Sequence, residues 1–460
     1  MQANFIHHPS SYRDPSGFIF EKNGILYRQV NKVFKEHFDF FIASGCYEKL
    51  VKKNWLIPHK TISQNLTGDD QWYETLQPEK LSFISYPYEW SFDMLKDAAL
   101  LTLDLLKEAL ASGMILKDAT PYNIQWHNGT LIFIDSLSFE KYDETMPWIA
   151  YRQFCECFLS PLLLAHHARM PLQEMLLAYS EGIPLAVTKS LLPWQTKFSI
   201  HTYLHIHLHA KYSLKNSSAA GKNAAFSKKK LLNLIASLEG LITKLKLPEN
   251  KSTWSDYYNE ASQRPDYLEH KQKLIQQWLE KINTLSTAAD LGANTGEFSK
   301  LTATKNVQTI ASDFDPYCIN ALYNEIKKNG ERNILPIIID LSKPSPAIGV
   351  NNEERDSFIK RTNVDMIFAL ALIHHLAIGK NIPLDKIAAL FQRMCRYLII
   401  EFVPKQDEKI QLMLAGKNDI YTDYTEENFL VAFKQYFTIV ENETIAGSAR
   451  TLYLMKKHEE

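Results

Sequence analysis

A short loop that contains two glycines and one carboxylate, Asp290-Leu-Gly-Ala-Asn-Thr-Gly296, has the composition of a ligand-binding turn. Gly292 and Gly296 let the backbone come close to a bound molecule. A helix that begins near Glu297 would point free N–H groups at a carboxylate. In an open α/β sheet, ligands sit beyond the carboxyl ends of the strands, where such turns occur. The loop therefore predicts a site for a small molecule that carries a carboxylate.

An acidic residue follows this turn at the end of the next expected strand. Asp313 ends the run Thr309-Ile-Ala-Ser-Asp313, where an acidic side chain about twenty residues after the turn normally binds ribose hydroxyls. Asp315 is the second choice for this role, and alternatively it caps a helix that starts at Pro316. The loop lacks the third glycine with which dinucleotide enzymes accommodate pyrophosphate, so a dinucleotide is disfavoured.

Three titratable residues are candidates for proton transfer. His374 and His375 follow an apolar run and should emerge at the mouth of the site, where an imidazole can remove a proton from a nucleophile. Alternatively, they form a wall of the cofactor pocket. Glu401 ends the following strand on the same side of the sheet and is the rival acid or base, with a surface carboxylate as its alternative reading.

A second constellation lies far upstream in the chain. Asp118, Asn123 and Asp135 have the spacing of a set in which one Asp lies near an acceptor hydroxyl, and an Asn and a second Asp hold Mg²⁺ and phosphates. This spacing resembles the catalytic and metal-binding loops of the protein-kinase fold, with Arg28 where a strand lysine is expected. We predict a kinase-like scaffold reused for substrate binding. An Mg-ATP site at these three residues, or simple turn caps around Pro121, are the alternatives.

The elements that position these residues form three predicted domains. Strand and helix patterns alternate after Asn283, which is typical of a parallel sheet with crossover helices. Two further β-rich runs, 437–444 and 451–455, form a closing hairpin. The predicted domains are an α+β N-terminal domain over 1–147, a helical extension and linker over 148–264 with a mobile stretch at about 213–230, and an α/β Rossmann-like domain over 265–460.

Four motifs in order resemble class I S-adenosylmethionine-dependent methyltransferases. They are the loop 290–296, Asp313-Phe-Asp-Pro, Asp340 after the third strand, and Leu372-Ile-His-His-Leu after the fourth. The resemblance implies a seven-stranded, mostly parallel sheet whose closing hairpin inserts one reversed strand. It implies S-adenosyl-L-methionine as cofactor, with Asp313 on the ribose and Asp340 on the adenine amino group. The cofactor-binding set is then Asp290, Gly292, Ala293, Asn294, Gly296, Asp313, Phe314, Asp340 and Leu341.

Over its whole length the chain resembles bacterial methyltransferases related to the nodulation protein NoeA. The matching stretches are Asp14-Pro-Ser-Gly-Phe, Asp118-Ala-Thr-Pro-Tyr-Asn, Ile134-Asp-Ser-Leu-Ser-Phe, Ala371-Leu-Ile-His-His-Leu and Glu401-Phe-Val-Pro. This resemblance explains both halves of the chain as one unit. Our leading hypothesis is a two-part methyltransferase whose N-terminal region helps bind or position the acceptor, a small molecule or a protein. The alternatives are a bifunctional or phosphotransferase protein with Mg-ATP, and a non-catalytic interaction protein that keeps the cofactor as a ligand.

Composition narrows the classes of partner. The 51 Lys and Arg residues balance 52 Asp and Glu residues, so no overall field attracts nucleic acid, and a nucleic-acid partner is not expected. No segment reaches about 18 uninterrupted apolar residues, so no membrane span is expected. The five cysteines are scattered and odd in number, which favours a reducing compartment, and we expect a cytoplasmic protein.

No metal site is predicted. On a helix, His201, His205 and His209 would share one face, but no carboxylate or cysteine nearby completes a ligand set. The pair Cys155 and Cys157 likewise has no second cysteine pair behind it, and structural zinc requires four ligands. Core packing explains both groups.

Overall fold

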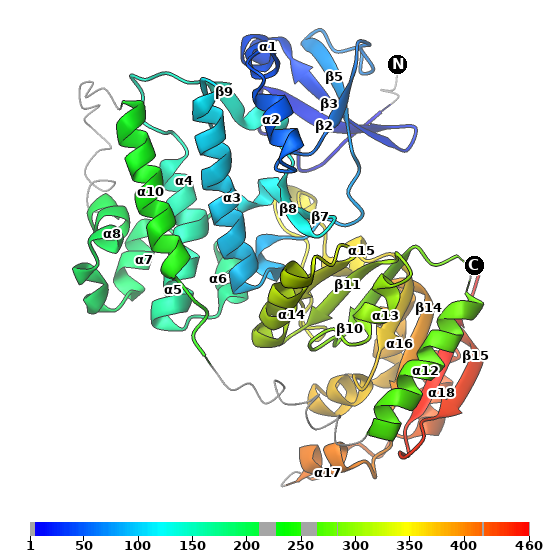
Figure 1. The fold of residues 1–460 in the computed structure, drawn as a ribbon. Helices are drawn as coiled ribbons and strands as arrows, with labels where there is room; N and C mark the ends of the chain where they lie inside the picture. The colour runs from blue at the N-terminus through cyan, green and yellow to red at the C-terminus, as the bar shows by residue number, and fades with distance from the viewer. Residues whose placement is uncertain (1–4, 211–226, 250–264, 283, 416–417, 460) are drawn as a thin grey trace. The chain divides into compact units, whose positions relative to one another are not determined.

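The computed structural model describes residues 5–210, 227–249, 265–282, 284–415 and 418–459. The chain divides into two compact units, Met1–Glu249 and Asn250–Glu460 (Figure 1). Most of the stretch predicted to be mobile, 213–230, lies outside the described residues, but its last part belongs to a helix that begins at Lys228. Residues 148–249 share one compact unit with residues 1–147, and a separate helical domain there stays a prediction.

The second unit is built on a seven-stranded sheet in the order β12-β11-β10-β13-β14-β16-β15. Only β16 is reversed relative to the other six strands of this sheet, because the closing hairpin places it between β14 and β15. This confirms the predicted mostly parallel sheet with an inserted reversed strand. The strands are β10 (Thr287–Leu291), β11 (Gln308–Asp313), β12 (Ile334–Ile338), β13 (Val364–Ala369), β14 (Cys395–Phe402), β15 (Phe437–Thr444) and β16 (Thr451–Lys457).

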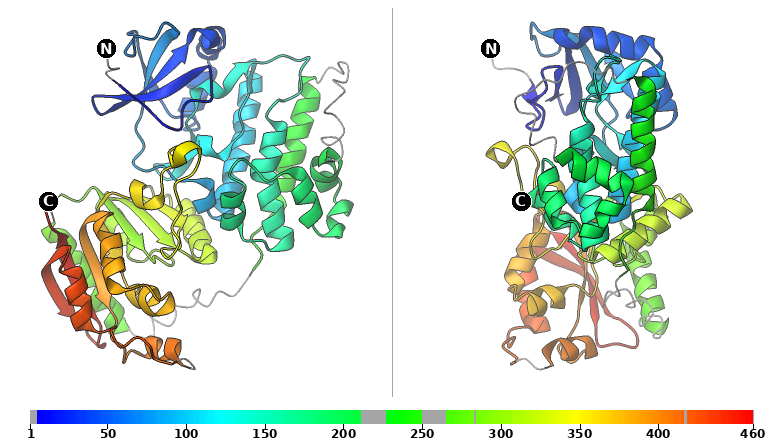
Figure 2. Two further views of the ribbon diagram at one scale, coloured as in Figure 1. Left: turned by 180° about the vertical axis from the view of Figure 1, so that it is seen from behind. Right: turned by 90° about the vertical axis from the view of Figure 1, so that its left-hand side faces the viewer.

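Helices cover both faces of this sheet (Figure 2). On one face, α12 packs its apolar side, with Ile275 and Trp278, against the sheet residues Met366, Phe368 and Ile399. The central strands are buried on both faces, which explains their nearly continuous apolar sequences. The helices are α12 (Pro265–Lys281), α13 (Ser299–Ala303), α14 (Pro316–Asn329), α15 (Phe358–Arg361), α16 (Leu384–Gln392), α17 (Glu408–Leu414) and α18 (Glu426–Phe433).

The first unit opens with a five-stranded antiparallel sheet in the order β1-β2-β3-β5-β4. A tight turn at Asn23 and Gly24, both with positive φ, joins β2 to β3. Two small antiparallel pairs, β6 with β9 and β7 with β8, follow the sheet. The strands are β1 (Ile6–His7), β2 (Gly17–Lys22), β3 (Ile25–Asn31), β4 (His59–Ile62), β5 (Trp72–Pro78), β6 (Met114–Leu116), β7 (Ile124–His127), β8 (Thr130–Phe133) and β9 (Phe139–Lys141).

A helical layer completes the first unit. Its longest member, α3, is capped at its start by Ser91, whose hydroxyl accepts from the Met94 amide. Within the described residues, no helix combines the length and the apolar character that a membrane span needs. The helices are α1 (Lys35–Ala43), α2 (Cys46–Lys52), α3 (Phe92–Ala111), α4 (Tyr151–Phe154), α5 (Ser160–Ala168), α6 (Leu172–Ala178), α7 (Leu185–Leu191), α8 (Ile200–Thr202) and α10 (Lys228–Lys244).

Candidate cofactor site

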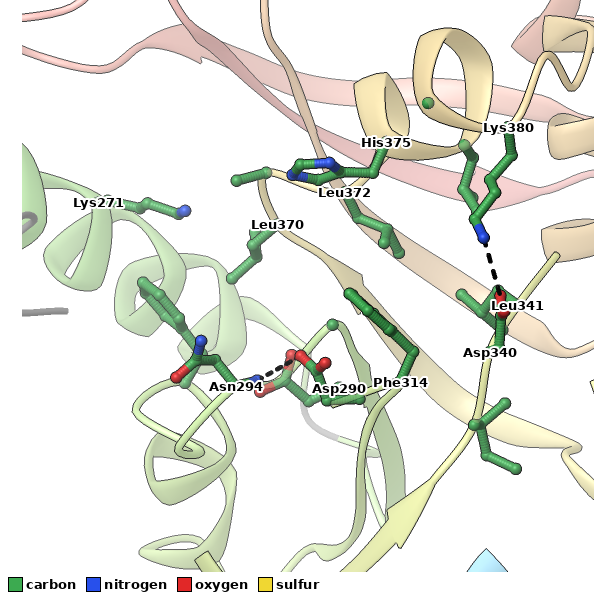
Figure 3. Close-up of a pocket in the computed structure, with 17 residues that line it drawn as sticks. Lys271, Asp290, Asn294, Phe314, Asp340, Leu341, Leu370, Leu372, His375 and Lys380 are labelled. Atoms are coloured by element: carbon green, nitrogen blue, oxygen red, sulfur yellow. Dashed lines mark hydrogen bonds and ion pairs between the residues drawn. The ribbon is translucent and has the colours of Figure 1, made fainter. Parts of the chain in front are cut away.

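A pocket of about 320 Å³ opens at the carboxyl ends of the central parallel strands of the second unit (Figure 3). This is the edge of an open α/β sheet where ligands are expected. Ala293 and Gly296 from the predicted set belong to the loop but not to the pocket wall. The predicted residues that line the pocket are Asp290, Gly292, Asn294, Asp313, Phe314, Asp340, Leu341 and His375.

The loop after β10 is held against β11 by its own backbone. The amides of Gly292 and Ala293 both donate to the carbonyl oxygen of Ser312, at 2.8 and 2.9 Å. Gly292 has a φ of +85° and Gly296 one of +81°, values that favour glycine. At Gly296 a Cβ atom would lie 2.7 Å from Leu322 Cδ1, so close packing on α14 requires this glycine.

The predicted helix after this loop is present and short. It begins at Ser299, two residues after Glu297 and within the predicted stretch, but α13 has only five residues. Ser299 is buried, and its hydroxyl donates to Asp290 Oδ2 at 2.7 Å. The residues before the helix therefore stay in turns. A bound carboxylate would consequently meet loop amides rather than the N-terminus of a long helix.

Two carboxylates of the pocket are buried without a cation directly on them. Asp313 accepts hydrogen bonds from the amides of Asn294 and Asp315, both at 2.9 Å. Burial raises the pKa of Asp313 to about 6, and burial likewise raises the pKa of Asp290 to about 6. A ligand with hydroxyl or ammonium donors would stabilise both carboxylates in their charged forms. Asp315 caps α14 through the Tyr317 amide, which was its alternative role.

The far end of the pocket combines an ion pair with apolar walls. Asp340 Oδ2 lies 3.8 Å from Lys380 Nζ, and Asp340 Oδ1 accepts from the hydroxyl of Ser342 at 2.6 Å. Leu341 and Leu376 line the pocket beside this pair. Figure 3 shows Asp340 and Lys380 together at one end, with Phe314 projecting between them and the loop. A flat apolar ring with a polar edge fits this end.

The two histidines have different positions. His375 lines the pocket, whereas His374 is almost fully buried and is not part of the pocket wall. Burial lowers the pKa of His375 to about 4 and that of His374 well below its usual value, with nearby positive charge adding to the effect. Both imidazoles are therefore neutral at pH 7, and His375 alone of the pair reaches the pocket.

Glu401 lies behind the pocket rather than at its mouth. Its side chain is 0% exposed and is held by Lys271 Nζ at 2.5 Å, the Tyr267 hydroxyl at 2.6 Å and Arg450 Nη1 at 3.3 Å. It also accepts from the Ala371 amide at 2.9 Å. Burial alone would raise its pKa, but the charges of Lys271 and Arg450 outweigh burial and lower that pKa to about 2. A carboxylate held this way is a poor proton acceptor, so the geometry favours a structural role.

Sequence reasoning did not single out Lys271, Tyr267 and Arg450, which form this buried cluster with Glu401. One signal was available in α12. Its apolar face carries Tyr267, Leu274 and Trp278 at helical spacing, and Lys271 occupies a position on the same face. A lysine on an apolar helix face requires a buried partner, and the sequence alone does not identify Glu401 as that partner.

Comparisons with known proteins show the family to which the chain belongs. No protein-family model matches it. The nodulation protein NoeA of Rhizobium meliloti (strain 1021) is 35% identical over 463 residues, a match that covers 98% of this chain and 96% of the relative. The chain belongs to the NoeA family. This confirms the whole-length resemblance seen in the sequence, and the NoeA-family match spans both units.

Solved structures similar to this NoeA-family chain share little sequence with it. The PH0226 protein from Pyrococcus horikoshii OT3 is 17% identical, with a TM-score of 0.33, over 42% of this chain and 91% of that one. Magnesium protoporphyrin IX methyltransferase from Synechocystis PCC 6803 with bound SAH is 14% identical, with a TM-score of 0.30, over 42% and 86%. The bifunctional kinase-methyltransferase WbdD is 18% identical, with a TM-score of 0.28, over 43% and 39%. Similarities with TM-scores this low do not indicate a shared activity.

The upstream constellation of this NoeA-family chain comes together in the first unit. Asp135 forms an ion pair with Arg28 and accepts from the Ser138 hydroxyl at 2.6 Å and the Leu137 amide at 3.1 Å. Asn123 Nδ2 donates to Asp118 Oδ2 at 3.1 Å. Both Asp135 oxygens thus accept hydrogen bonds from donors of this chain. The Mg-ATP alternative stays a prediction.

The histidine group of the first unit packs within the protein. His201 Nδ1 and His205 Nε2 lie 2.7 and 2.9 Å from Ser237 Oγ. His205 Nδ1 lies 2.8 Å from the Tyr151 hydroxyl, and the ring of His209 stacks on Tyr151. Among the described residues, no group of three or more His, Cys, Asp or Glu side chains is arranged to hold a metal ion.

Proposed function

We propose that this protein is a methyltransferase that uses S-adenosyl-L-methionine. The observation that carries the proposal is the pocket at the carboxyl ends of β10 to β13, lined by the loop after β10 and by Asp313 and Asp340. The donor and acceptor chemistry fits the cofactor, because Asp313 and Asp290 are buried carboxylates that lack a cation directly on them. The sheet around the pocket contains the inserted strand that the resemblance implies.

The protein's own residues would hold the cofactor at three places. Asp313 would accept hydrogen bonds from the ribose hydroxyls, and Asp340 would accept one from the adenine amino group between the apolar walls. The loop from Asp290 to Gly296 would bind the methionine end. The bound cofactor supplies an activated methyl group, so the protein needs only to position the acceptor, exclude water and remove a proton where the acceptor carries one.

We propose His375 as the residue that removes this proton. It lines the pocket, and this position carries the assignment. Burial lowers the pKa of its imidazole to about 4, so the imidazole is neutral at pH 7 but is a weaker base than a free imidazole. A neutral imidazole can accept a proton. His374 and Glu401, the other two predicted candidates, are buried outside the pocket wall.

The acceptor is proposed to be a small molecule or a protein, and the first unit is proposed to help bind it, since the NoeA match covers both units.

Calorimetric titration with S-adenosylmethionine and with S-adenosylhomocysteine tests the proposal. The wild type should bind both, and Asp313→Ala should bind them about ten- to a hundredfold more weakly, because it loses hydrogen bonds to a charged acceptor. A wild type that binds neither ligand would contradict the proposal. Transfer of a labelled methyl group to any acceptor separates an enzyme from a non-catalytic binding protein. A parallel titration of the wild type with Mg-ATP tests the nucleotide alternative, and the absence of heat would contradict that alternative.

Affinity for S-adenosylhomocysteine should fall as the pH drops through about 6. Burial raises the pKa of Asp313 and Asp290 to about 6 in the free protein, and the ligand's donors bind the ionised carboxylates more strongly than the protonated ones. Ligand binding should therefore leave the number of bound protons unchanged above pH 7. Near pH 5.5, ligand binding should release protons. Titrations at pH 5, 6, 7 and 8 measure this dependence. Equal affinity at all four values would contradict it, and Asp313→Asn should show a shallower dependence.

A further inference from the structure

Lys271 brings a buried positive charge to the wall of the cofactor pocket. It projects from α12, a helix that precedes the first strand of the sheet and lies outside the strand-to-helix turns that form the rest of the site (Figure 3). Its side chain is 4% exposed. A lysine is almost never buried to this degree without a partner, so its position requires an explanation.

One partner of Lys271 is Glu401, at 2.5 Å from Nζ to Oε2. Glu401 is also bound by Arg450, which in turn pairs with Asp407 at 2.8 Å. Two cations and two carboxylates thus balance in this cluster. The ammonium has three N–H donors, and Glu401 and the Tyr267 hydroxyl, the latter at 3.5 Å, accept from two of them. The third donor remains for the pocket that the lysine lines.

The charges around the pocket distinguish its two ends. Among the residues that line it, Lys271 and Lys380 are the cations. Lys380 lies 3.8 Å from Asp340 at the end assigned to adenine. Lys271 is at the other end, on the side of Asn294 and the loop, as Figure 3 shows. A ligand that spans the pocket with a ribose on Asp313 therefore has its second end near the Lys271 charge.

We propose that Lys271 binds the α-carboxylate of the cofactor's methionine moiety. This inference rests on the proposed function and assigns one charged group of the cofactor to one residue. A carboxylate held by a lysine in a site shielded from water gains a charge-assisted hydrogen bond, which is stronger than a neutral one. The short α13 helix makes this contact important, since a helix of five residues provides only a weak dipole for the carboxylate.

Comparison of ligands with and without the carboxylate tests this contact. S-adenosylhomocysteine carries the group, its decarboxylated analogue lacks it, and methylthioadenosine lacks the whole amino-acid end. The wild type should bind S-adenosylhomocysteine about ten- to a hundredfold more tightly than the decarboxylated analogue. In Lys271→Met this ratio should approach one. The affinity for methylthioadenosine should stay within about twofold of the wild type, because this ligand has no group that contacts Lys271.

Two variants serve as controls. Lys271→Arg keeps the charge and should retain most of the preference for the carboxylate. Lys380→Met removes the other cation of the pocket and should change the affinities for all three ligands by the same factor. If Lys271→Met does not fold, the affinities of the wild type still test the inference. Equal affinity of the wild type for S-adenosylhomocysteine and its decarboxylated analogue overturns it. An equal loss for all ligands in Lys271→Met also overturns it. A wild type that binds none of them contradicts the proposed function instead.

Discussion

Replacing Glu401 with glutamine is expected to lower the free energy of unfolding of the second unit by about 3–5 kcal/mol, the usual cost of removing one partner of a buried ion pair. Glu401 is fully buried and compensates Lys271 and Arg450, which are both nearly as buried. Glutamine has the same shape but no charge, so Lys271 would lose its counter-charge. The amide of Ala371, a residue with a φ of +50°, would also lose a charged acceptor.

Hydrogen-exchange mass spectrometry of residues 265–460 measures this loss separately from the first unit. Glu441→Gln is a matched control, because Glu441 also pairs with a lysine of α12, Lys281, but at the surface. It should cost less than about 1 kcal/mol. A loss equally small in Glu401→Gln would show that the cluster does not stabilise the unit.

The pH dependence of this loss has a defined sign. In the wild type the pKa of Glu401 is lowered to about 2, so its stabilising effect is present above the ordinary glutamate pKa and disappears as the pH falls toward 2. Glutamine does not titrate. The difference in stability between the wild type and Glu401→Gln should therefore be largest near neutral pH and should narrow as the pH falls from 5.

The sheet and the loop of the second unit were predictable because they depend on local patterns. Buried parallel strands are continuous apolar runs, and β13 over Val364–Ala369 and β15 over Phe437–Thr444 have the predicted bounds. The loop after β10 was readable because Gly292 and Gly296 both adopt a positive φ, a conformation that favours glycine. Ser299 was less predictable as the start of α13, because the turns before it depend on the contact between Ser299 and Asp290.

Residues that act through distant partners were not predictable in the same way. Lys271 and Glu401 are 130 positions apart, and no local pattern relates them. Glu401 ends β14 as predicted, but the sequence does not show that α12 and Arg450 cover its side chain. Which of the two adjacent histidines faces the pocket depends on the turn after β13, where Ala371 adopts a positive φ. Alanine gives no sequence signal for that conformation.

Replacing Gly292 with arginine is expected to weaken S-adenosylhomocysteine binding by at least about a thousandfold, an energy of roughly 4 kcal/mol. Gly292 lines the pocket, and a Cβ atom there would already lie 3.4 Å from Leu372 Cδ1 across it. The rest of an arginine side chain would occupy space in a cavity of about 320 Å³ that the ligand needs. The substitution also places a β-carbon at a φ of +85°, which costs about 1–2 kcal/mol in stability.

Gly330→Arg separates these two effects. Gly330 ends α14 with a φ of +69°, so the same substitution imposes a similar backbone cost, but nothing lies within 4 Å of its Cβ position and it does not line the pocket. Its thermal unfolding should shift about as much as that of Gly292→Arg, while its affinity for S-adenosylhomocysteine should match the wild type. If Gly292→Arg instead binds the ligand within tenfold of the wild type, the cofactor does not occupy this pocket, because a bound cofactor and an arginine side chain cannot share it.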